Sequence, residues 1–215
     1  MSAARIRQTE LLPLASDPEA DFRRQGVSLI AGVDEVGRGP LAGPVVAAAV
    51  ILAATSTFPG LTDSKLLTPA RRESFDLQVR QEALSFSIQA VEALEIETLG
   101  ILAASLKAMA LAVQNLNPGP ELVLIDGPWR LPIHHTQQPV IKGDQRCLAI
   151  AAASVLAKVY RDRLMQHYHQ LYPQYNFAGH KGYATREHLA ALRRWGPCPL
   201  HRRTFRGVKE WCGPG

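Results

Sequence analysis

Apolar and polar positions along the chain follow two periods, and the shorter one is that of β-strands. Three mostly apolar runs have the length and composition of strands. These runs cover residues 28–36, 45–52 and 121–126. Residues 83–90 alternate, with Leu84, Phe86 and Ile88 on one face, and residues 139–142 form a further short apolar segment. The pattern therefore predicts five strands.

The longer period is that of helices, and it occupies the segments between the strands. Apolar residues that recur every three or four positions predict helices. Thr68 before Pro69 is a typical helix start, and Thr185 is expected to cap another helix. The expected helices span residues 69–82, 95–115, 146–171 and 185–195, with a loop over 179–182. The order of strands and helices predicts one mixed α/β domain.

The start of the chain is patterned more weakly than the rest. Pro13, Pro18 and Gly26 interrupt it, and its positive and negative charges balance. We therefore expect residues 1–27 to form an N-terminal arm, flexible or partly helical. Residues 28–215 are expected to form a single domain.

Composition narrows the class of protein. A chain of 215 residues with 47% apolar residues can bury a substantial core. The longest apolar run, residues 45–54, is too short to cross a bilayer, and no signal peptide is recognisable. Three cysteines without metal-site spacing suggest reduced thiols and a cytoplasmic location.

The charge is distributed unevenly. The net charge is +5, but residues 142–215 carry 13 Lys and Arg against 4 Asp and Glu. A basic C-terminal third beside an acidic site suggests a polyanionic partner. A basic surface that is merely solvated accounts for the charge equally well.

Four carboxylates stand at the ends of predicted elements. Asp34, Glu35 and Asp126 follow apolar strands, and Asp144 precedes the long helix. If the strands are neighbours, the acids gather at one edge and need cations to remain ionised together. Oxygen ligands favour Mg²⁺ or Mn²⁺, and two such ions about 3.5–4 Å apart suit phosphodiester hydrolysis.

Each acid also has a simpler explanation. Any of them could be a solvated turn residue, and Asp144 could cap the helix that follows it. Adjacent residues of a strand point to opposite faces. Asp34 and Glu35 can therefore share a site only if the strand ends or twists there, as the nearby Gly37 allows.

The turn after the first strand has the composition of a ligand-binding loop. Gly37 and Gly39 let the backbone approach a ligand, and Arg38 between them can hold a phosphate. A dinucleotide-binding loop is excluded, because Gly37, Gly39 and Gly43 miss the required spacing by one residue and a strand follows.

Six segments in order, between about residues 30 and 208, resemble motifs of the type 2 ribonucleases H, specifically bacterial ribonuclease HII. They are Gly32 to Val45, Asp63 to Leu67, Lys142 to Asp144, Ile150 to Asp162, His180 to Thr185 and His201 to Phe205. The resemblance implies an α/β ribonuclease H-like fold, with a mixed central sheet flanked by helices and a helical, basic C-terminal region. Asn176, Gly207 and Cys147 depart from the family pattern in loops and packing positions.

The same resemblance implies roles for individual residues. Asp34, Glu35, Asp126 and Asp144 would be catalytic and would hold two Mg²⁺ or Mn²⁺ ions. Gly37, Arg38 and Gly39 would contact the ribose 2′-hydroxyl, and Tyr183 would pack on the next sugar. The expected phosphate contacts are Lys65, Lys181, Arg202 and Arg203.

The implied substrates are RNA:DNA hybrids and duplex DNA containing single ribonucleotides, cut on the 5′ side of the ribonucleotide to leave 3′-hydroxyl and 5′-phosphate ends. The alternative is a binding protein that has kept the fold without the activity. Such a protein would be expected to have lost acids from the cluster. No membrane partner and no more than a monomer are expected. A sliding-clamp partner at a terminus is left open.

Overall fold

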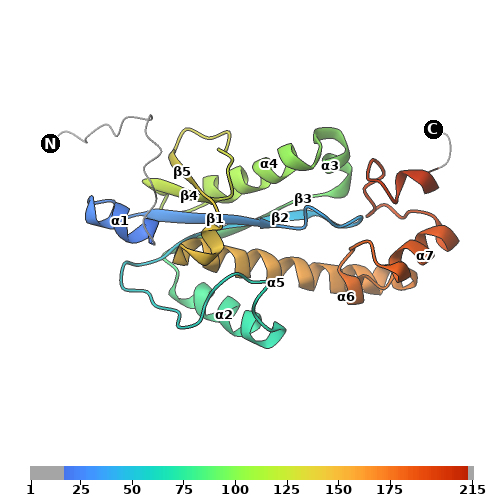
Figure 1. The fold of residues 1–215 in the computed structure, drawn as a ribbon, viewed down its shortest axis with the longest axis horizontal. Helices are drawn as coiled ribbons and strands as arrows, with labels where there is room; N and C mark the ends of the chain where they lie inside the picture. Colours follow the sequence, from blue (N-terminus) through green and yellow to red (C-terminus); the bar gives the residue numbers. More distant parts are fainter. Residues whose placement is uncertain (1–16, 213–215) are drawn as a thin grey trace.

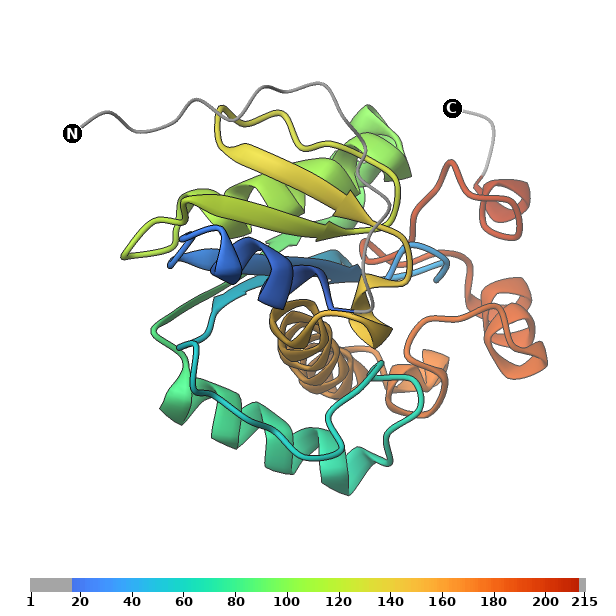
Figure 2. The same ribbon diagram turned by 60° about the vertical axis from the view of Figure 1, so that its left-hand side comes forward.

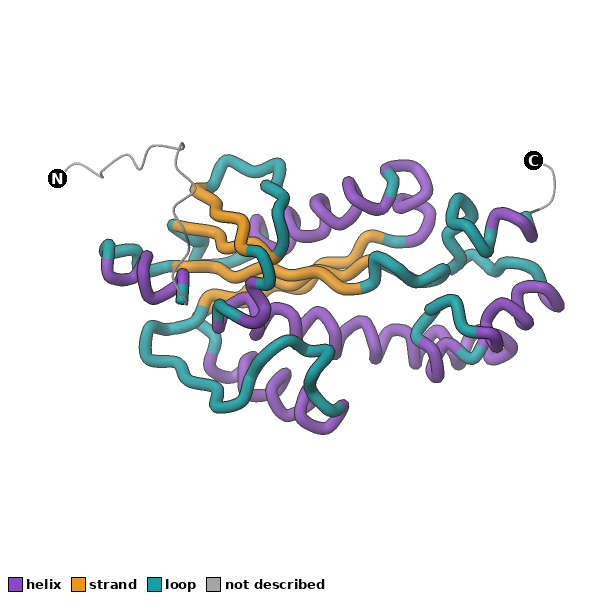
Figure 3. Tube along the Cα trace, viewed as in Figure 1, coloured by secondary structure: helices purple, strands orange, loops and turns teal. Residues whose placement is uncertain are grey.

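A five-stranded mixed sheet forms the centre of the molecule (Figures 1 and 3). The computed structural model describes residues 17–212. The strands are β1 (Ile30–Val36), β2 (Val45–Ile51), β3 (Ser85–Val91), β4 (Leu122–Asp126) and β5 (Thr136–Val140). Their order is β3-β2-β1-β4-β5, with β1 antiparallel to β2 and parallel to β4. The predicted mixed α/β architecture is confirmed.

Helices cover both faces of this sheet. The α-helices of the described residues are α1 (Pro18–Arg24), α2 (Pro69–Glu82), α3 (Ala93–Leu99), α4 (Ile101–Gln114), α5 (Leu148–Leu171), α6 (Phe177–His180) and α7 (Arg186–Trp195). Helix α4 lies on one face and α5 on the other, with α2 on the outer side of α5 (Figure 2). The sheet therefore separates two apolar core layers.

The alternation along β1 decides which side chains face which helix. Ile30 packs in the core layer that contains Ala149 and Ile150 of α5. Ala31 and Val33 pack in the layer of α4. Because successive strand residues point to opposite faces, Gly32 and Asp34 face α5.

The prediction of one long helix over 95–115 is wrong in one respect. The segment is two helices, α3 and α4, which meet at Gly100 with a bend of 117°. Gly100 has φ of +78°, a conformation that favours glycine. Both helices bury apolar residues in the same core layer, so the apolar spacing continues across the break.

Other parts of the chain also differ from expectation. Strand β5 covers Thr136–Val140 instead of 139–142. The prediction missed the start of this strand because a half-buried polar strand at the sheet edge lacks an apolar signal. Asp144 lies in a 3₁₀ turn, Gly143–Gln145, and Cys147 precedes α5, so Asp144 does not cap that helix. Helix α6 occupies part of the expected loop over 179–182.

Part of the expected arm is helical and is bound to the start of α5. The Glu19 carboxylate is buried and accepts hydrogen bonds from Cys147 Sγ at 3.2 Å and from the Ala149 N–H at 3.1 Å. A carboxylate is favourable at a helix N-terminus, where backbone N–H groups lack partners. Residues 1–16 of the arm and 213–215 of the C-terminal end lie outside the described residues.

Within residues 17–212 no single helix is long and apolar enough to cross a membrane. The bent pair α3 and α4 meets the length and composition criteria only when its two helices are taken together.

We expect Gly32→Ala to destabilise the protein by about 3 kcal/mol, the upper end of the usual cost of overpacking. A Cβ at this position would lie 2.2 Å from the backbone carbon of Ala149 and 2.2 Å from the backbone nitrogen of Ile150. Urea unfolding measures the difference. Gly119→Ala is the matched control because a Cβ there meets nothing within 4 Å. Equal midpoints for the two variants would contradict the close contact.

Candidate active site

Two of the predicted acids stand side by side at the carboxyl ends of parallel strands. Val33 of β1 is paired with Ile125 of β4, so Asp34 and Asp126 occupy the next positions of the two strands. Leu124, two residues before Asp126, packs in the α5 layer. Because side chains alternate along a strand, Asp126 and Asp34 share the face that α5 covers.

Burial and neighbouring negative charges act on Asp34. Its side chain is buried, which raises the pKa of its carboxyl well above the usual range, and the charges of Glu35 and Asp126 raise it further. Two interactions oppose this effect: the Glu35 N–H donates to Asp34 Oδ1 at 2.7 Å, and the nearby Ser154 hydroxyl of α5 also lowers the pKa of the carboxyl. Asp34 is thus held in place while its charge is only partly compensated.

Glu35 is positioned by the end of the strand. It follows Asp34 and so starts on the other face, but β1 ends at Val36. Arg38 Nη1 lies 3.4 Å from Glu35 Oε1. Burial raises the pKa of Glu35, the Arg38 charge lowers it, and the Asp126 charge raises it, with a net increase. Glu35 therefore belongs electrostatically to the same cluster as Asp126.

Asp144 completes the cluster from a different element. It is buried in the 3₁₀ turn, and the neighbouring Gly143 N–H donates to Asp126 Oδ1 at 2.7 Å. Burial, followed by the charges of Asp126 and Asp63, raises the pKa of Asp144 to about 6, although the Lys65 ammonium opposes the shift. The structure thus brings together all four predicted acids.

Lys65 lies among these carboxylates. Its Nζ is 3.8 Å from Asp63 Oδ1 and 4.0 Å from Asp144 Oδ2. Burial lowers the pKa of Lys65, but the charges of Asp63, Asp34, Asp144 and Asp126 together raise it above its ordinary value. One ammonium therefore experiences the charges of Asp63 and of three of the four predicted acids.

The donor set suits a hard divalent cation. The candidate ligands are carboxylate oxygens, the atoms that Mg²⁺ and Mn²⁺ prefer, and mutual repulsion among them favours a cation. In the part of the chain that the structure describes, no group of three or more His, Cys, Asp or Glu side chains is arranged to hold a metal ion as it stands. The acids fit the ion by chemistry, but cation binding requires their side chains to rearrange.

The loop over residues 37–44 lies next to the acids and carries the predicted ribose contacts. Gly37 has φ of +96°, and a Cβ there would lie 2.4 Å from Arg161 Nε. A Cβ on Gly39 would be 3.7 Å from Tyr183 Cε1. Tyr183 is 46% exposed. The structure thus places Tyr183 and the glycine loop together at the surface.

The predicted phosphate contacts separate into different environments. Arg202 is fully buried and donates to backbone carbonyls of residues 37–43. The prediction that it contacts phosphate is therefore wrong, because no part of the guanidinium reaches the surface. Lys181 Nζ donates to the Ala178 carbonyl at 2.7 Å, and Lys65 is bound among the acids. Arg203 is exposed, and its backbone N–H donates to Glu97 Oε1 at 2.6 Å.

Two buried histidines hold the backbone of Tyr183. His201 Nδ1 accepts a hydrogen bond from the Cys198 N–H at 3.0 Å, so Nε2 carries the proton of the neutral ring. That Nε2 donates to His188 Nε2 at 3.0 Å, and His188 Nδ1 donates to the Tyr183 carbonyl at 2.9 Å. Burial lowers the pKa of His188 to about 4 and that of His201 to about 3. Both rings are therefore neutral at neutral pH.

Some residues around the site were not predicted from the sequence. They are Asp63, Ser154, Arg161, His188 and, in its buried role, Arg202. One signal was available for Arg161. It lies four residues from both Ala157 and Met165, on the apolar face of a long helix, where a charged residue implies a buried partner.

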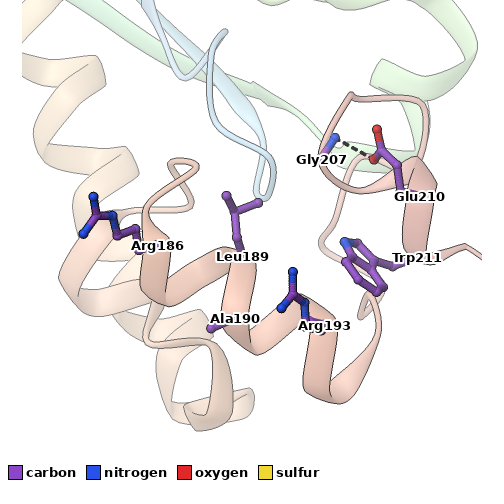
Figure 4. A pocket seen from close by; sticks show the side chains of 7 residues that line it. All are labelled: Arg186, Leu189, Ala190, Arg193, Gly207, Glu210 and Trp211. Carbon is purple, nitrogen blue, oxygen red and sulfur yellow. Dashed lines mark hydrogen bonds between the residues drawn. The ribbon is translucent and has the colours of Figure 1, made fainter.

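A hollow in the C-terminal region is separate from the acid cluster (Figure 4). One wall is α7, with Arg186, Leu189 and Arg193, and the other includes Glu210 and Trp211. The Arg193 guanidinium carbon lies 5.9 Å from the centre of the Trp211 ring. None of the predicted site residues lines this hollow.

Comparisons with known proteins find similar sequences and similar folds. The family described as Ribonuclease HII matches residues 31–208. Ribonuclease HII of Syntrophotalea carbinolica is 51% identical over 193 residues, covering 90% of this chain and 92% of that protein.

Two solved structures confirm the fold. Ribonuclease H2 from Pyrococcus horikoshii has a TM-score of 0.73 at 24% identity, covering 84% of this chain and 95% of that one. Bst-RNase HIII in complex with Mn²⁺ has a TM-score of 0.64 at 18% identity, covering 90% and 72%.

The histidine pair predicts a pH effect on stability. Each folded-state pKa is lowered, so the unfolded chain binds more protons below about pH 6.5, and the free energy of unfolding decreases as the pH falls. Each histidine contributes up to about 1.4 kcal/mol per pH unit between its unfolded and folded pKa. The raised pKa values of Asp34, Glu35 and Asp144 act in the opposite direction, so a difference between variants is needed.

We expect the stability deficit of His201→Gln, relative to the unmodified protein, to shrink by roughly 1–2 kcal/mol between pH 7 and pH 5. Urea unfolding at both pH values measures it. His167→Gln is the control, because it removes an exposed imidazole instead of a buried one. A constant deficit for His201→Gln would show that the buried ring is not neutral.

Proposed function

Since this chain belongs to the ribonuclease HII family, we propose that it also incises duplex DNA at single embedded ribonucleotides, in a reaction that depends on divalent cations. The family consists of endoribonucleases, hydrolases that cleave the RNA of RNA:DNA hybrids, and this chain is such an enzyme. The proposed cut lies on the 5′ side of the ribonucleotide and leaves 3′-hydroxyl and 5′-phosphate ends. The observation that carries the proposal is the cluster of Asp34, Glu35, Asp126 and Asp144 beside the glycine loop.

These four carboxylates would hold two Mg²⁺ or Mn²⁺ ions. Bound there, the ions would supply an activated water and a Lewis acid for phosphodiester hydrolysis. The raised pKa values of Asp34, Glu35 and Asp144 support this assignment, because negative charge accumulates there beyond what Lys65 and Arg38 offset. A related ribonuclease HIII has been solved in complex with Mn²⁺, which supports the choice of ion.

Recognition of the ribonucleotide is assigned to the glycine loop and Tyr183. The 2′-hydroxyl both donates and accepts hydrogen bonds and distinguishes RNA from DNA. Backbone groups of Gly37, Arg38 and Gly39 suit such a group, and the half-exposed ring of Tyr183 offers a flat face to the next sugar. Arg203 and Lys65 remain proposed phosphate contacts, and Lys181 would have to give up its bond to the Ala178 carbonyl.

The remaining assignments follow from the family and the charge. The basic residues of 142–215 would attract the phosphate backbone. We place the enzyme in the cytoplasm, where its three free cysteines would stay reduced, and we assign it as a monomer. A sliding-clamp partner and the domain boundary at residue 28 stay predictions.

Asp126→Asn should lower cleavage of a DNA duplex with one ribonucleotide at least 100-fold while duplex binding changes little. The Asn side chain can still accept the Gly143 N–H bond at Oδ1, but it removes the charge that a cation needs. Labelled-duplex cleavage with Mg²⁺, Mn²⁺ or chelator measures the effect, with an all-DNA duplex beside it.

Glu73→Gln is the control for Asp126→Asn, because Glu73 is half-exposed on α2 and pairs with Arg163. Full activity of Asp126→Asn, or unmodified protein that cleaves in chelator, would refute the cation assignment. No cleavage by the unmodified protein with either metal would refute the proposed incision.

Tyr183→Ala should reduce cleavage at a single ribonucleotide about tenfold more than cleavage of a long hybrid. A long hybrid offers many registers, whereas one ribonucleotide must be bound in one register against this ring. Tyr160→Ala is the control, because Tyr160 is 40% exposed on α5, close to the exposure of Tyr183. Equal losses on both substrates would remove Tyr183 from ribonucleotide recognition.

A further inference from the structure

Two buried arginines bind the inner side of the glycine loop. Arg202 donates to the carbonyls of Gly37 at 2.5 Å, Arg38 at 2.9 Å, Pro40 at 2.8 Å and Gly43 at 2.8 Å. Its side chain is 0% exposed. Carbonyls along one side of the loop therefore turn inward to a single guanidinium.

Arg161 does the same for the end of the loop. It donates to the carbonyls of Pro44 at 3.0 Å and Ala42 at 3.1 Å, and to the Lys181 carbonyl at 3.1 Å. It too is 0% exposed. The loop that precedes Tyr183 is thereby attached to the glycine loop through one side chain.

Neither arginine makes an ion pair with any of the described residues. Burial lowers the pKa of both, and their mutual repulsion lowers that of Arg202 further. Removing an unpaired charge from water is costly unless dipoles replace the water. Carbonyl dipoles do so here, so the charges and the loop conformation depend on each other.

The inward carbonyls determine where the neighbouring N–H groups point. In a trans peptide the carbonyl of one residue and the N–H of the next point in opposite directions. Because the Gly37 and Arg38 carbonyls face Arg202, the N–H groups of Arg38 and Gly39 face away from it. Both residues are exposed, and neither N–H has a hydrogen-bond partner within residues 17–212. The Leu41 N–H, in contrast, donates to the Gly182 carbonyl at 2.8 Å.

We propose that Arg202, supported by Arg161, is a positioning residue that holds the Arg38 and Gly39 N–H groups outward as a fixed pair of donors for oxygens of the ribonucleotide. The inference rests on the proposed function, and it identifies the residue that makes the glycine loop selective for a ribonucleotide over a deoxynucleotide. A deoxynucleotide lacks the 2′ oxygen and leaves a donor without a partner, which lowers its affinity. The two buried positive charges behind the loop further favour an electron-rich ligand in front of it.

Lysine cannot replace Arg202 in this role. A guanidinium presents five N–H donors in a planar fork, whereas an ammonium is a compact point charge with three. Arg202→Lys retains the charge but cannot reach the carbonyls of Gly37, Arg38, Pro40 and Gly43 at once. The loop carbonyls are then free to rotate, and the N–H pair is no longer fixed.

The test measures affinity in chelator for two matched duplexes, one with a single ribonucleotide and one all-DNA. We expect Arg202→Lys to reduce the preference for the ribonucleotide duplex about tenfold, with all-DNA binding unchanged. Arg161→Lys should reduce this preference less, because Arg161 bonds the far end of the loop. Arg163→Lys is the control, since Arg163 lies on the same helix but pairs with Glu73 and Asp76. A folded Arg202→Lys with full preference would overturn the proposal.

Amide hydrogen exchange in the unmodified protein provides an independent test that does not require the variant to fold. The Arg38 and Gly39 amides should exchange rapidly in the free protein and slow at least tenfold with the ribonucleotide duplex, but not with all-DNA. Equal exchange with both duplexes would overturn the positioning role. Failure of the proposed function is recognised separately, as absence of cleavage by the unmodified protein with Mg²⁺ or Mn²⁺.

Discussion

The close approach of α5 to β1 is the contact on which the rest of the site depends. It is possible because Gly32 has no side chain, so the strand backbone meets the backbone of Ala149 and Ile150. A helix held at this distance places Ser154 under Asp34, and two turns further on it places Arg161 under the glycine loop. A single helix thus supports both the acids and the glycine loop.

The acid cluster and the glycine loop carry buried charges of opposite sign, and these charges are stabilised in different ways. Around Asp126 carboxylates accumulate, and the charge of Asp126 raises the pKa values of Asp34, Glu35 and Asp144, so the cluster favours a cation. Under the glycine loop, Arg161 and Arg202 are buried without ion-pair partners among the described residues and are stabilised by carbonyl dipoles. A phosphodiester bound across this boundary would meet a cation-binding surface on one side and outward N–H donors on the other.

Much of the fold could be predicted locally. The Thr68 and Thr185 caps start α2 and α7 as expected, because their hydroxyls accept from N–H groups three residues ahead. The break at Gly100 was missed, and the polar strand β5 was predicted over 139–142 instead of Thr136–Val140. Apolar spacing depends on which residues are buried. Burial continues across the bend at Gly100, so the spacing does not reveal the break, and burial is weak along the edge strand β5, so the spacing does not mark its start. Asp34, Glu35 and Asp126 were singled out because they follow apolar strands, and Asp144 because it precedes the long helix and lies in a motif that resembles the family's.

The sequence by itself determined the family and most of the sheet strands, and it singled out the four acids, since these inferences depend on residue type, spacing and motifs read along the chain. Only the tertiary structure decided what Arg202 does. Its motif suggested a phosphate contact, but folding places segment 198–202 against residues 41–43 and buries the guanidinium. Asp63 likewise gains its role from its proximity to Asp144, which is distant in the sequence. His188 gains its role from its hydrogen bond with the buried ring of His201. Residue type sets which bonds a side chain can make, but only the packed chain sets which partners are within reach.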